Sequence, residues 1–268
     1  MGQRTDNEGE SFMSDLFDLT GKVAVINGGT STLGSSMALG LAKHGTKIAL
    51  VGRNQEKALQ IEKQIQEAGG VVRFFHGDVT DEKSVQNAAS EIEKWTGGWD
   101  ILLNAPGINS TTPFFDLSMD EWDKIMSVNL KGVVLTCQIF AKKMIEQERG
   151  GSIINISSVS SNPPLSKVFS YSASKAGINN VTQYLARELA PYHIRVNAII
   201  PGFFPAEQNR KILSEERTEA IMNHTPMNRF GKPEELQGTA VWLASEAASS
   251  FVTGSLIRVD GGFGAMTI

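Results

Sequence analysis

The stretch Val23-Ala24-Val25-Ile26-Asn27-Gly28-Gly29-Thr30-Ser31-Thr32-Leu33-Gly34 decides the fold, because it joins a short apolar run directly to a glycine-rich turn. The apolar run is typical of a buried strand, and the turn leads into a stretch with helical periodicity. Glycines at a strand-to-helix turn let the backbone approach a pyrophosphate, which the positive end of the helix stabilises. Such a loop is a weak signal by itself. Its place after the first strand of an alternating chain strengthens the prediction of a nucleotide site.

Short apolar runs alternate with longer amphipathic stretches along the whole chain. The runs that predict strands are 23–26, 47–51, 71–75, 100–103, 153–156, 194–200 and 256–259. Helices are expected between them, including a long one from about 118 to 147 and two or three within 207–247. Near-continuous apolar strands separated by helices are typical of a parallel sheet covered on both faces. We therefore predict an α/β fold: a single-domain, Rossmann-type, doubly wound sheet of about seven strands with helices on both faces.

Length, charge and cysteine content limit the class of protein. A chain of 268 residues has ample material for one large domain, and no linker or repeat divides it. The net charge of −4 gives no electrostatic support for nucleic-acid binding. No apolar run approaches the roughly eighteen residues of a membrane span. The one cysteine, Cys137, lies in an apolar run, and we expect a buried thiol in a reducing cytoplasm.

The first residues of the chain are polar and lack the apolar core of a signal peptide. We expect 1–17 to be a disordered N-terminal extension and 18–268 to form the domain, with a substrate segment at about 203–230. No metal site is expected, and His224, alone among polar residues, is assigned no role.

Three residues near the middle of the chain form a candidate acid/base centre. Tyr171 and Lys175 are four apart, so on a helix their side chains lie one turn apart on one face. Ser158 follows the apolar run 153–156, where a strand is expected to end. A nearby lysine favours the phenolate, and a pKa lowered by about three units corresponds to roughly 4 kcal/mol. Taken alone, Tyr-x-x-x-Lys is more often an amphipathic surface pair; the serine and the glycine loop favour catalysis.

The glycine loop, the turn Asn104-Ala105-Pro106-Gly107, Ser158 and Tyr171-x-x-x-Lys175 together resemble the short-chain dehydrogenase/reductase family, from about residue 18 to the end. The resemblance implies an NAD(P)-dependent oxidoreductase that transfers a hydride between nicotinamide and a secondary alcohol or ketone. It implies that Tyr171 exchanges the hydroxyl proton, that Lys175 lowers the phenol pKa and holds the nicotinamide ribose, and that Ser158 orients the substrate oxygen. Asn129 matches the helix asparagine that positions the lysine through a water and completes a proton relay.

The same resemblance implies a set of dinucleotide contacts. These are Gly28, Thr30, Thr32, Leu33, Gly34, Arg53, Asp78, Val79, Asn104, Gly107, Tyr171, Lys175, Pro201, Gly202 and Phe204. The chain departs from the family pattern in four places. Asn27 replaces a threonine, Thr32 replaces a glycine, Pro106 is gained where an asparagine pair is reduced to one, and Ala206 replaces a threonine. We expect these changes to act on cofactor affinity more than on the binding mode.

The end of the second expected strand bears on the choice of dinucleotide. An acidic residue there would accept hydrogen bonds from the ribose 2′-OH and favour NAD. Gly52 leaves that place empty, and Arg53 is suited to pair with a 2′-phosphate. We therefore favour NADP(H) over NAD(H), although an Arg53 that is solvated or stacked on adenine is compatible with either.

The segment 203–211, after the sixth expected strand, is the candidate substrate segment. Two aromatic residues followed by Gln, Asn and Arg suit a polyhydroxylated substrate more than a steroid or a fatty chain. With 225–231 and 260–263, the segment is similar to family members that act on sugar acids, such as D-mannonate oxidoreductases and gluconate 5-dehydrogenases. Gln208 and Arg210 are the candidate contacts, because a guanidinium binds a carboxylate bidentately. The alternative is a solvated Arg210.

Two other functions are weighed against this interpretation. A dinucleotide-binding regulator without turnover would fit the four departures, but the intact catalytic set argues against it. A reductase of acyl-carrier thioesters would need a basic docking patch, for which Lys142, Lys143 and Arg149 are too few. The resemblance also implies a homotetramer or homodimer built on the helices of Asn129 and Tyr171, with a small molecule as the other partner.

Overall fold

The computed structural model describes residues 16–204 and 214–266, and seven strands within them form one sheet. Every neighbouring pair is parallel, in the order β3-β2-β1-β4-β5-β6-β7. The strands are β1 (Val23–Asn27), β2 (Lys47–Gly52), β3 (Val72–His76), β4 (Ile101–Asn104), β5 (Gly151–Ile156), β6 (Ile194–Pro201) and β7 (Leu256–Val259). The predicted fold class is confirmed, and the predicted strand ends lie within two residues of the observed ones.

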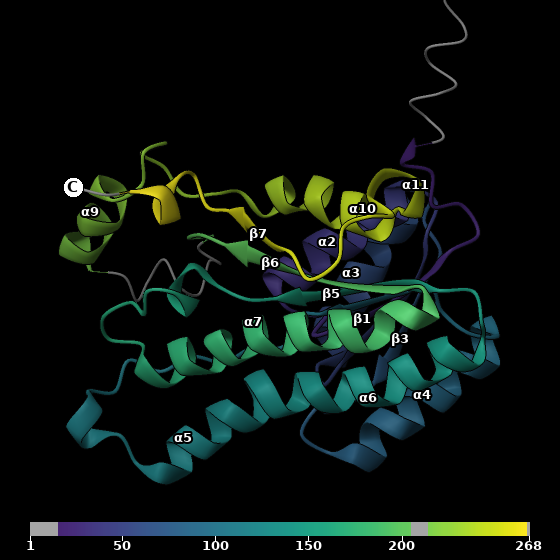
Figure 1. The fold of residues 1–268 in the computed structure, drawn as a ribbon, viewed down its shortest axis with the longest axis horizontal. Helices are drawn as coiled ribbons and strands as arrows, with labels where there is room; N and C mark the ends of the chain where they lie inside the picture. Colours follow the sequence, from purple (N-terminus) through teal and green to yellow (C-terminus); the bar gives the residue numbers. More distant parts are fainter. Residues whose placement is uncertain (1–15, 205–213, 267–268) are drawn as a thin grey trace, which may run out of the picture.

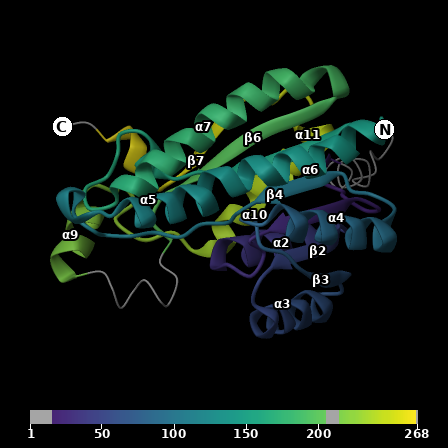
Figure 2. The same cartoon turned by 90° about the horizontal axis from the view of Figure 1, so that it is seen from below.

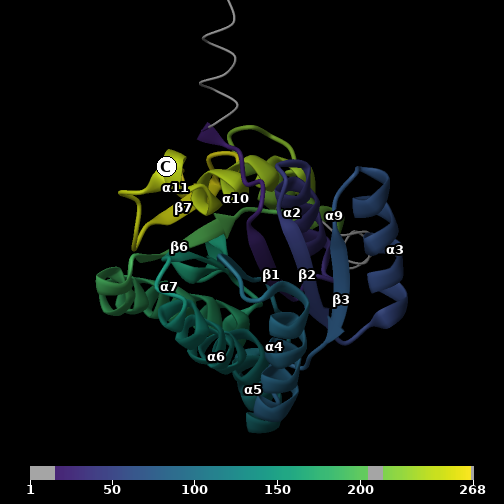
Figure 3. The same cartoon turned by 90° about the vertical axis from the view of Figure 1, so that its right-hand side faces the viewer.

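Helices cover both faces of this sheet, as Figure 1 and Figure 3 show. One face packs against α2 (Thr32–Lys43), α3 (Gln55–Glu67) and α10 (Gln237–Ala244). The other packs against α4 (Glu82–Thr96), α6 (Gly132–Glu146) and α7 (Phe169–Leu189). Because both faces are covered, strands such as β1 and β6 are buried along their whole length. This explains why their sequences are continuous apolar runs.

The predicted long helix at 118–147 is present, but it is not uniform. It consists of α5 (Met119–Met126), a π-helical segment (Ser127–Lys131) and then α6, one after the other. π-helical turns are rare and frequently lie at functional sites. This one carries Asn129, one of the predicted catalytic residues.

A ladder of buried asparagines crosses the middle of the sheet. The register places Asn27 of β1 beside Asn104 of β4, and Asn104 beside Asn155 of β5. Asn27 Nδ2 donates to Asn104 Oδ1 at 3.1 Å, and Asn104 Nδ2 donates to Asn155 Oδ1 at 3.0 Å. Asn155 Nδ2 then donates to Thr182 Oγ1 of α7 at 3.0 Å. Because buried amides are costly unless they are bonded, the ladder fixes the register of the strand ends.

Leu16 and Phe17, which precede the predicted boundary at residue 18, contact the domain. Ser245 Oγ donates to Leu16 O at 2.6 Å, Phe17 packs on the core, and Leu19 is fully buried. The extension was predicted to be disordered over 1–17; its first fifteen residues lie outside the described residues, so for these the prediction is untested. Cys137 is buried as expected, which raises the pKa of its thiol to about 12. Across the described ranges, no helix has the length and apolar character needed to cross a membrane.

The remaining elements lie beyond the sheet. The helix α9 (Glu215–Asn223) follows residues 205–213, which are not described, and α11 (Glu246–Ser249) precedes β7. In Figure 1 and Figure 2, α9 lies on the left, at the end toward which the arrows of β5 and β6 point in Figure 1. It therefore lies near the carboxyl edge of the sheet, where open α/β sheets bind ligands.

Candidate active site

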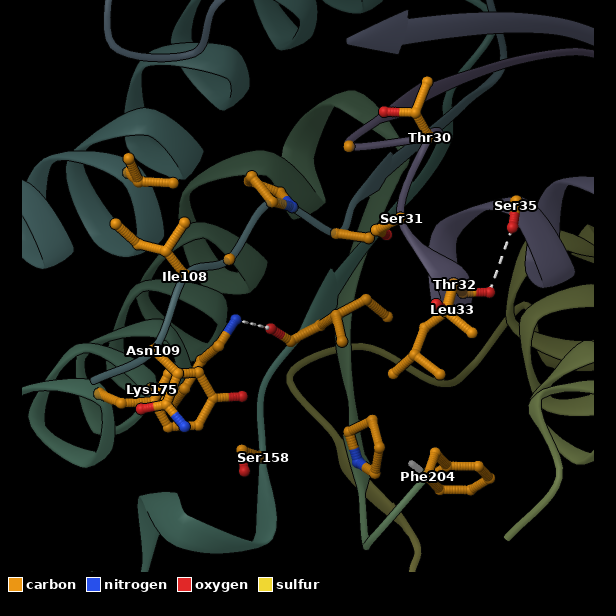
Figure 4. A pocket seen from close by; sticks show the side chains of 18 of the residues that line it. Thr30, Ser31, Thr32, Leu33, Ser35, Ile108, Asn109, Ser158, Lys175 and Phe204 are labelled. Atoms are coloured by element: carbon orange, nitrogen blue, oxygen red, sulfur yellow. Dashed lines mark hydrogen bonds between the residues drawn. The ribbon is translucent and has the colours of Figure 1, made fainter. Parts of the chain in front are cut away.

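A cleft of about 2060 Å³ crosses the carboxyl edge of the sheet. It lies where the strand order reverses between β1 and β4, which is the usual ligand site of such sheets. Most of the predicted cofactor and catalytic residues line it. They are Gly28, Thr30, Thr32, Leu33, Arg53, Asp78, Val79, Gly107, Ser158, Tyr171, Lys175, Pro201, Gly202 and Phe204. Figure 4 shows the turn residues Thr30 to Ser35 on one side of the cleft, with Lys175 and Ser158 on the other.

The glycine turn is held by sterics and by a helix cap. Gly28 has a φ of 71°, and a Cβ there would lie 2.7 Å from the backbone of Ala105 and Pro106. Ser31 caps α2 by accepting a bond from Gly34 N at 3.1 Å. A Cβ on Gly34 would collide with the carbonyl oxygen of Gly28. The turn therefore tolerates only glycine at both positions.

This construction fits the pyrophosphate of a dinucleotide. The first amides of a helix have no partner within the helix, and those of α2 begin at the cleft wall that Ser31 and Thr32 form. A side chain at position 28 would fill the space between this turn and the β4 loop. Gly34 does not line the cleft, so its part is to let the helix start pack against the turn.

The structure places Asn104 behind the cleft, not in it. Its side chain is fully buried, and its Oδ1 accepts bonds from Asn27 Nδ2 and from Thr136 Oγ1 at 2.9 Å. Its Nδ2 donates to Asn155 and to the Cys137 sulfur. All of its side-chain polar atoms are used to hold the strand ends together, so only its backbone is left for the predicted dinucleotide contact, which stays a prediction.

The departures from the family pattern fall into different environments. Asn27 belongs to the buried ladder, whereas Thr32 and Pro106 line the cleft. Ala206 lies outside the described residues, as do the predicted substrate contacts Gln208 and Arg210. Those two contacts therefore stay predictions.

At the end of the cleft beside β2 and β3, Arg53 and Asp78 form a charged pair. Arg53 Nη1 lies 3.5 Å from Asp78 Oδ2, and the arginine side chain is 64% exposed. Burial by itself raises the pKa of Asp78, but the hydrogen bonds from Thr80 and the Arg53 guanidinium outweigh it and lower the pKa below its usual value. Asp78 is therefore ionised, and it orients Arg53 beside Gly52 at the end of β2.

The three predicted acid/base residues come together at the end of β5 and the start of α7. Ser158 begins a 3-10 turn, and its Oγ accepts bonds from Ser160 N at 3.2 Å and Ser160 Oγ at 3.0 Å. Lys175 Nζ donates to Ile156 O at 2.8 Å and lies 5.7 Å from the centre of the Tyr171 ring. The spacing therefore puts the hydroxyl, the phenol and the ammonium on one wall.

The electrostatics of this wall differ from the expectation that Lys175 lowers the phenol pKa. Burial raises the pKa of Tyr171, and a hydrogen bond with Ser158 opposes this only in part. Burial also lowers the pKa of Lys175 to about 8. Desolvation wins because the ammonium points to the carbonyl of Ile156. At neutral pH the phenol is thus protonated and able to donate.

Asn129 acts in this structure as a clamp. Its Oδ1 accepts from Ile108 N at 2.8 Å, and its Nδ2 donates to Ile108 O at 2.9 Å and to Ser174 Oγ at 3.1 Å. Ser174 Oγ in turn donates to Tyr171 O at 2.7 Å. The amide is fully used and does not line the cleft. The side chain of Asn129 thus ties α7 to the loop after β4. Only its backbone is left to take part in the predicted proton relay.

At the catalytic end, two cations that the sequence motifs do not include also line the cleft. Lys167 precedes α7, and Arg217 lies in the first turn of α9. Neither belongs to a recognisable spacing, and about fifty residues separate them in the chain. Only the folded arrangement brings them to one site.

A family model described as enoyl-(acyl carrier protein) reductase matches residues 28–264. An uncharacterized oxidoreductase of Bacillus subtilis, UxuB, is 40% identical over 267 residues, which cover 92% of this chain and 96% of that protein. The chain belongs to the short-chain dehydrogenase/reductase family. It is an NAD(P)-dependent oxidoreductase that acts on CH–OH groups, as the motifs predicted.

Two solved structures of this family are similar along almost their whole length. A gluconate 5-dehydrogenase from Burkholderia cenocepacia, in complex with NADP and tartrate, is 35% identical with a TM-score of 0.90. The alignment covers 95% of this chain and 100% of that one. A putative D-mannonate oxidoreductase from Haemophilus influenzae, with bound NAD, is 34% identical with a TM-score of 0.89, covering 95% and 99%. The family therefore uses either dinucleotide in this fold.

Proposed function

We propose that this enzyme interconverts the secondary hydroxyl of a sugar acid and the corresponding ketone. The observation that carries the proposal is the arrangement of Ser158, Tyr171 and Lys175 on one wall of a wide cleft. The likeness to a gluconate 5-dehydrogenase over its whole length supports a polyhydroxylated acid as substrate.

In the reduction of a ketone, Tyr171 donates the proton that the substrate oxygen takes up. Its raised pKa keeps this proton in place until the oxygen gains negative charge. Ser158 accepts two bonds from Ser160 and forms a hydrogen bond with Tyr171, so its hydroxyl lies beside the phenol, where it can orient the substrate oxygen. A nicotinamide dinucleotide supplies or accepts the hydride when it is bound. Lys175, held by Ile156 O, provides a positive charge beside the phenol below about pH 8.

NADP(H) is our proposal for the preferred dinucleotide. Its support is Arg53, which lies at the end of β2 where an acidic residue would favour NAD. A 2′-phosphate would compete with Asp78 for the guanidinium, since both are anions. Replacing Arg53 with Gln should raise the KM for NADP(H) about tenfold and change the KM for NAD(H) little. Equal KM changes for both dinucleotides would contradict the preference.

The thioester-reductase alternative finds no further support in the structure. Lys143 is paired with Glu93 at 2.6 Å and with Glu146, and Arg149 is paired with Asp100 at 3.4 Å. These charges are therefore neutralised locally and form no free basic patch around this group.

A homo-oligomer, either tetramer or dimer, is also proposed, with α6 and α7 as an interface. Figure 1 and Figure 3 show the two helices side by side on the outside of the molecule, and Tyr184 of α7 is 55% exposed. Size-exclusion chromatography with light scattering would give the mass of the protein in solution. The mass of a monomer would contradict this part of the proposal. The reducing cytoplasm stays our proposal for the compartment, supported by the lone, buried Cys137.

The test of the proposed function is turnover measured by the absorbance of reduced nicotinamide. The panel contains aldonates such as gluconate and mannonate, the matching polyols, simple secondary alcohols and a 3-hydroxyacyl thioester, each with NADP⁺ and with NAD⁺. We expect the highest kcat/KM with an aldonate. A higher kcat/KM with the thioester, or turnover of simple alcohols alone, would overturn the proposal.

A further inference from the structure

The two ends of the cleft differ in charge. Of the described lining residues, the only carboxylates are Glu56 and Asp78, which belong to the segments after β2 and β3. At the catalytic end the described lining includes the cations Lys167, Lys175 and Arg217, and no described carboxylate. The neighbouring Glu121 accepts bonds from the hydroxyls of Ser110 and Thr112 and does not line the cleft. The catalytic end is therefore electropositive.

Lys175 is committed to Ile156 O, which leaves Lys167 and Arg217. Neither of these two is within 4.0 Å of a carboxylate in the part of the chain that the structure describes. Glu215 and Glu216 lie in the first turn of α9 but do not line the cleft. Two cations that face one cavity give it a positive potential, which attracts an anionic ligand.

Arg217 is held in place by a specific contact. Its Nη1 donates to Ser166 Oγ at 2.7 Å, and its Nη2 donates to Ser166 O at 3.1 Å. These two bonds use part of the guanidinium, which has five N–H donors in all. The remaining donors are available to a ligand while the contact fixes the plane of the group. The arginine is only half-buried, so water or a ligand reaches it.

The same contact supports the backbone that presents the second cation. Lys167 follows Ser166 directly and has a φ of 66°, which residues other than glycine rarely adopt. Such strain persists where the surroundings hold it, and it gathers at ligand sites. Arg217 fastens the residue before it, and α7 begins two residues after it. The turn therefore places Lys167 a few residues before Tyr171.

We propose that Lys167 and Arg217 bind the carboxylate of the substrate and make the enzyme select acids over neutral polyols. The proposal rests on the proposed sugar-acid function and adds the residues that recognise the acid group. Arg217 provides a fixed fork of donors, and Lys167 provides a compact charge on a flexible stem. Arg210, predicted from the sequence for this role, lies outside the described residues and stays a separate prediction.

The first experiment measures binding, so that it does not depend on turnover. Gluconate and tartrate are titrated calorimetrically into the full-length enzyme with saturating reduced dinucleotide, which cannot oxidise them, with glucitol and threitol as the neutral counterparts. We expect the acids to bind more tightly than the polyols, and Arg217→Gln and Lys167→Gln each to weaken the acids about 10- to 100-fold. Arg217→Lys, which keeps the charge but loses the fork, should fall between. Arg73→Gln, an exposed arginine away from the cleft, should bind as the wild type does.

The second experiment compares kcat/KM for an acid with that for its polyol. We expect Arg217→Gln to lower the ratio of the two by raising the KM for the acid, and added salt to lower the ratio in the wild type more than in the variant. Equal losses for acid and polyol, or acids that bind no better than polyols, would overturn the inference. If the acids bind through these residues but no acid is turned over, the proposed function fails and the carboxylate site stands.

Discussion

The two ends of the cleft are built in different ways. The dinucleotide end is made of backbone: Gly28 and Gly34 lie where a Cβ would collide with the chain, and helix amides face the site. The catalytic end is made of side chains, which arrive from β5, α7 and α9. A backbone site depends on a short stretch of sequence, whereas a side-chain site depends on how distant segments pack. Substitutions at the dinucleotide end should therefore act through steric clashes. Substitutions at the catalytic end should act through lost charges and lost proton transfer.

The largest effect is expected from Tyr171→Phe, which removes the proton donor and keeps the ring. Turnover should fall about 10²- to 10⁴-fold, the usual contribution of a positioned acid or base. Dinucleotide affinity, measured by fluorescence titration, should stay within about threefold, because Tyr171 is only one of many predicted dinucleotide contacts and the variant keeps its ring. Retained turnover would refute the assignment of the proton to Tyr171. A loss of dinucleotide binding of similar size would show that the two ends are not separable.

Gly28→Ala tests the dinucleotide end in the same manner. The substitution places a Cβ at 2.7 Å from the backbone of Ala105 and Pro106, at a φ of 71°. It should lower the free energy of unfolding by about 2–4 kcal/mol, measured in urea, and weaken dinucleotide binding. Gly21→Ala is the matched control, since Gly21 has a φ of 79° and a Cβ on it would meet no described atom within 4 Å. It should cost only about 1 kcal/mol, the cost of the backbone conformation alone. Equal losses would mean that the close approach to the β4 loop contributes nothing.

Lys175→Met contrasts activity with stability at the catalytic end. The pKa of about 8 in the folded protein lies below the ordinary 10.5, so the unfolded chain binds more protons between these values. Wild-type stability therefore rises with pH from about 8 to 10.5, and the full cost of burying the charge is present below pH 8. The variant should be more stable at pH 7 by about 2 kcal/mol, after the loss of the bond to Ile156 O, and much less active.

Urea unfolding across pH 7 to about 10.5 measures this difference directly. The stability advantage of the variant should shrink as the pH rises, because the wild-type lysine loses its charge. An advantage that is independent of pH would show that packing, not the buried charge, is responsible.

Much of the fold could be predicted from the sequence, because strands and helix faces depend on patterns within short stretches of the chain. Apolar runs predicted the strands, and the spacing of Tyr171 and Lys175 predicted their shared helix face. The π-helical segment was not predictable in this way; it carries Asn129, whose side chain bonds to Ile108 and Ser174, far from it in the chain. Nor was the burial of Asn104, which follows from the register of three strands that are far apart in the chain.

The pair of cations at the catalytic end, Lys167 and Arg217, was the least predictable part for the same reason. Arg217 and Ser166 are 51 residues apart, and no periodicity links them. Lys167 has a left-handed backbone conformation, but it is neither a glycine nor an asparagine, so the sequence gives no signal of this conformation. Arg210 was predicted for the carboxylate from composition alone, whereas Lys167 and Arg217 are identified by the cleft that they share.

The smallest effects are expected at two departures from the family pattern. One lies in the buried ladder of the sheet and the other on the cleft, so the pair compares stability with dinucleotide binding. Asn27→Thr removes the donor to Asn104 Oδ1, which keeps its bond from Thr136, and it also removes the Asn27 Oδ1, which has no hydrogen-bond partner among the described residues. The free energy of unfolding should therefore fall by about 1 kcal/mol or less, with no change in the KM for dinucleotide. Thr32→Gly, at the first residue of α2 and on the cleft, should instead change that KM by a few-fold. A KM shift for Asn27→Thr as large as that for Thr32→Gly would show that the ladder beneath the turn, and not only its surface, sets cofactor affinity.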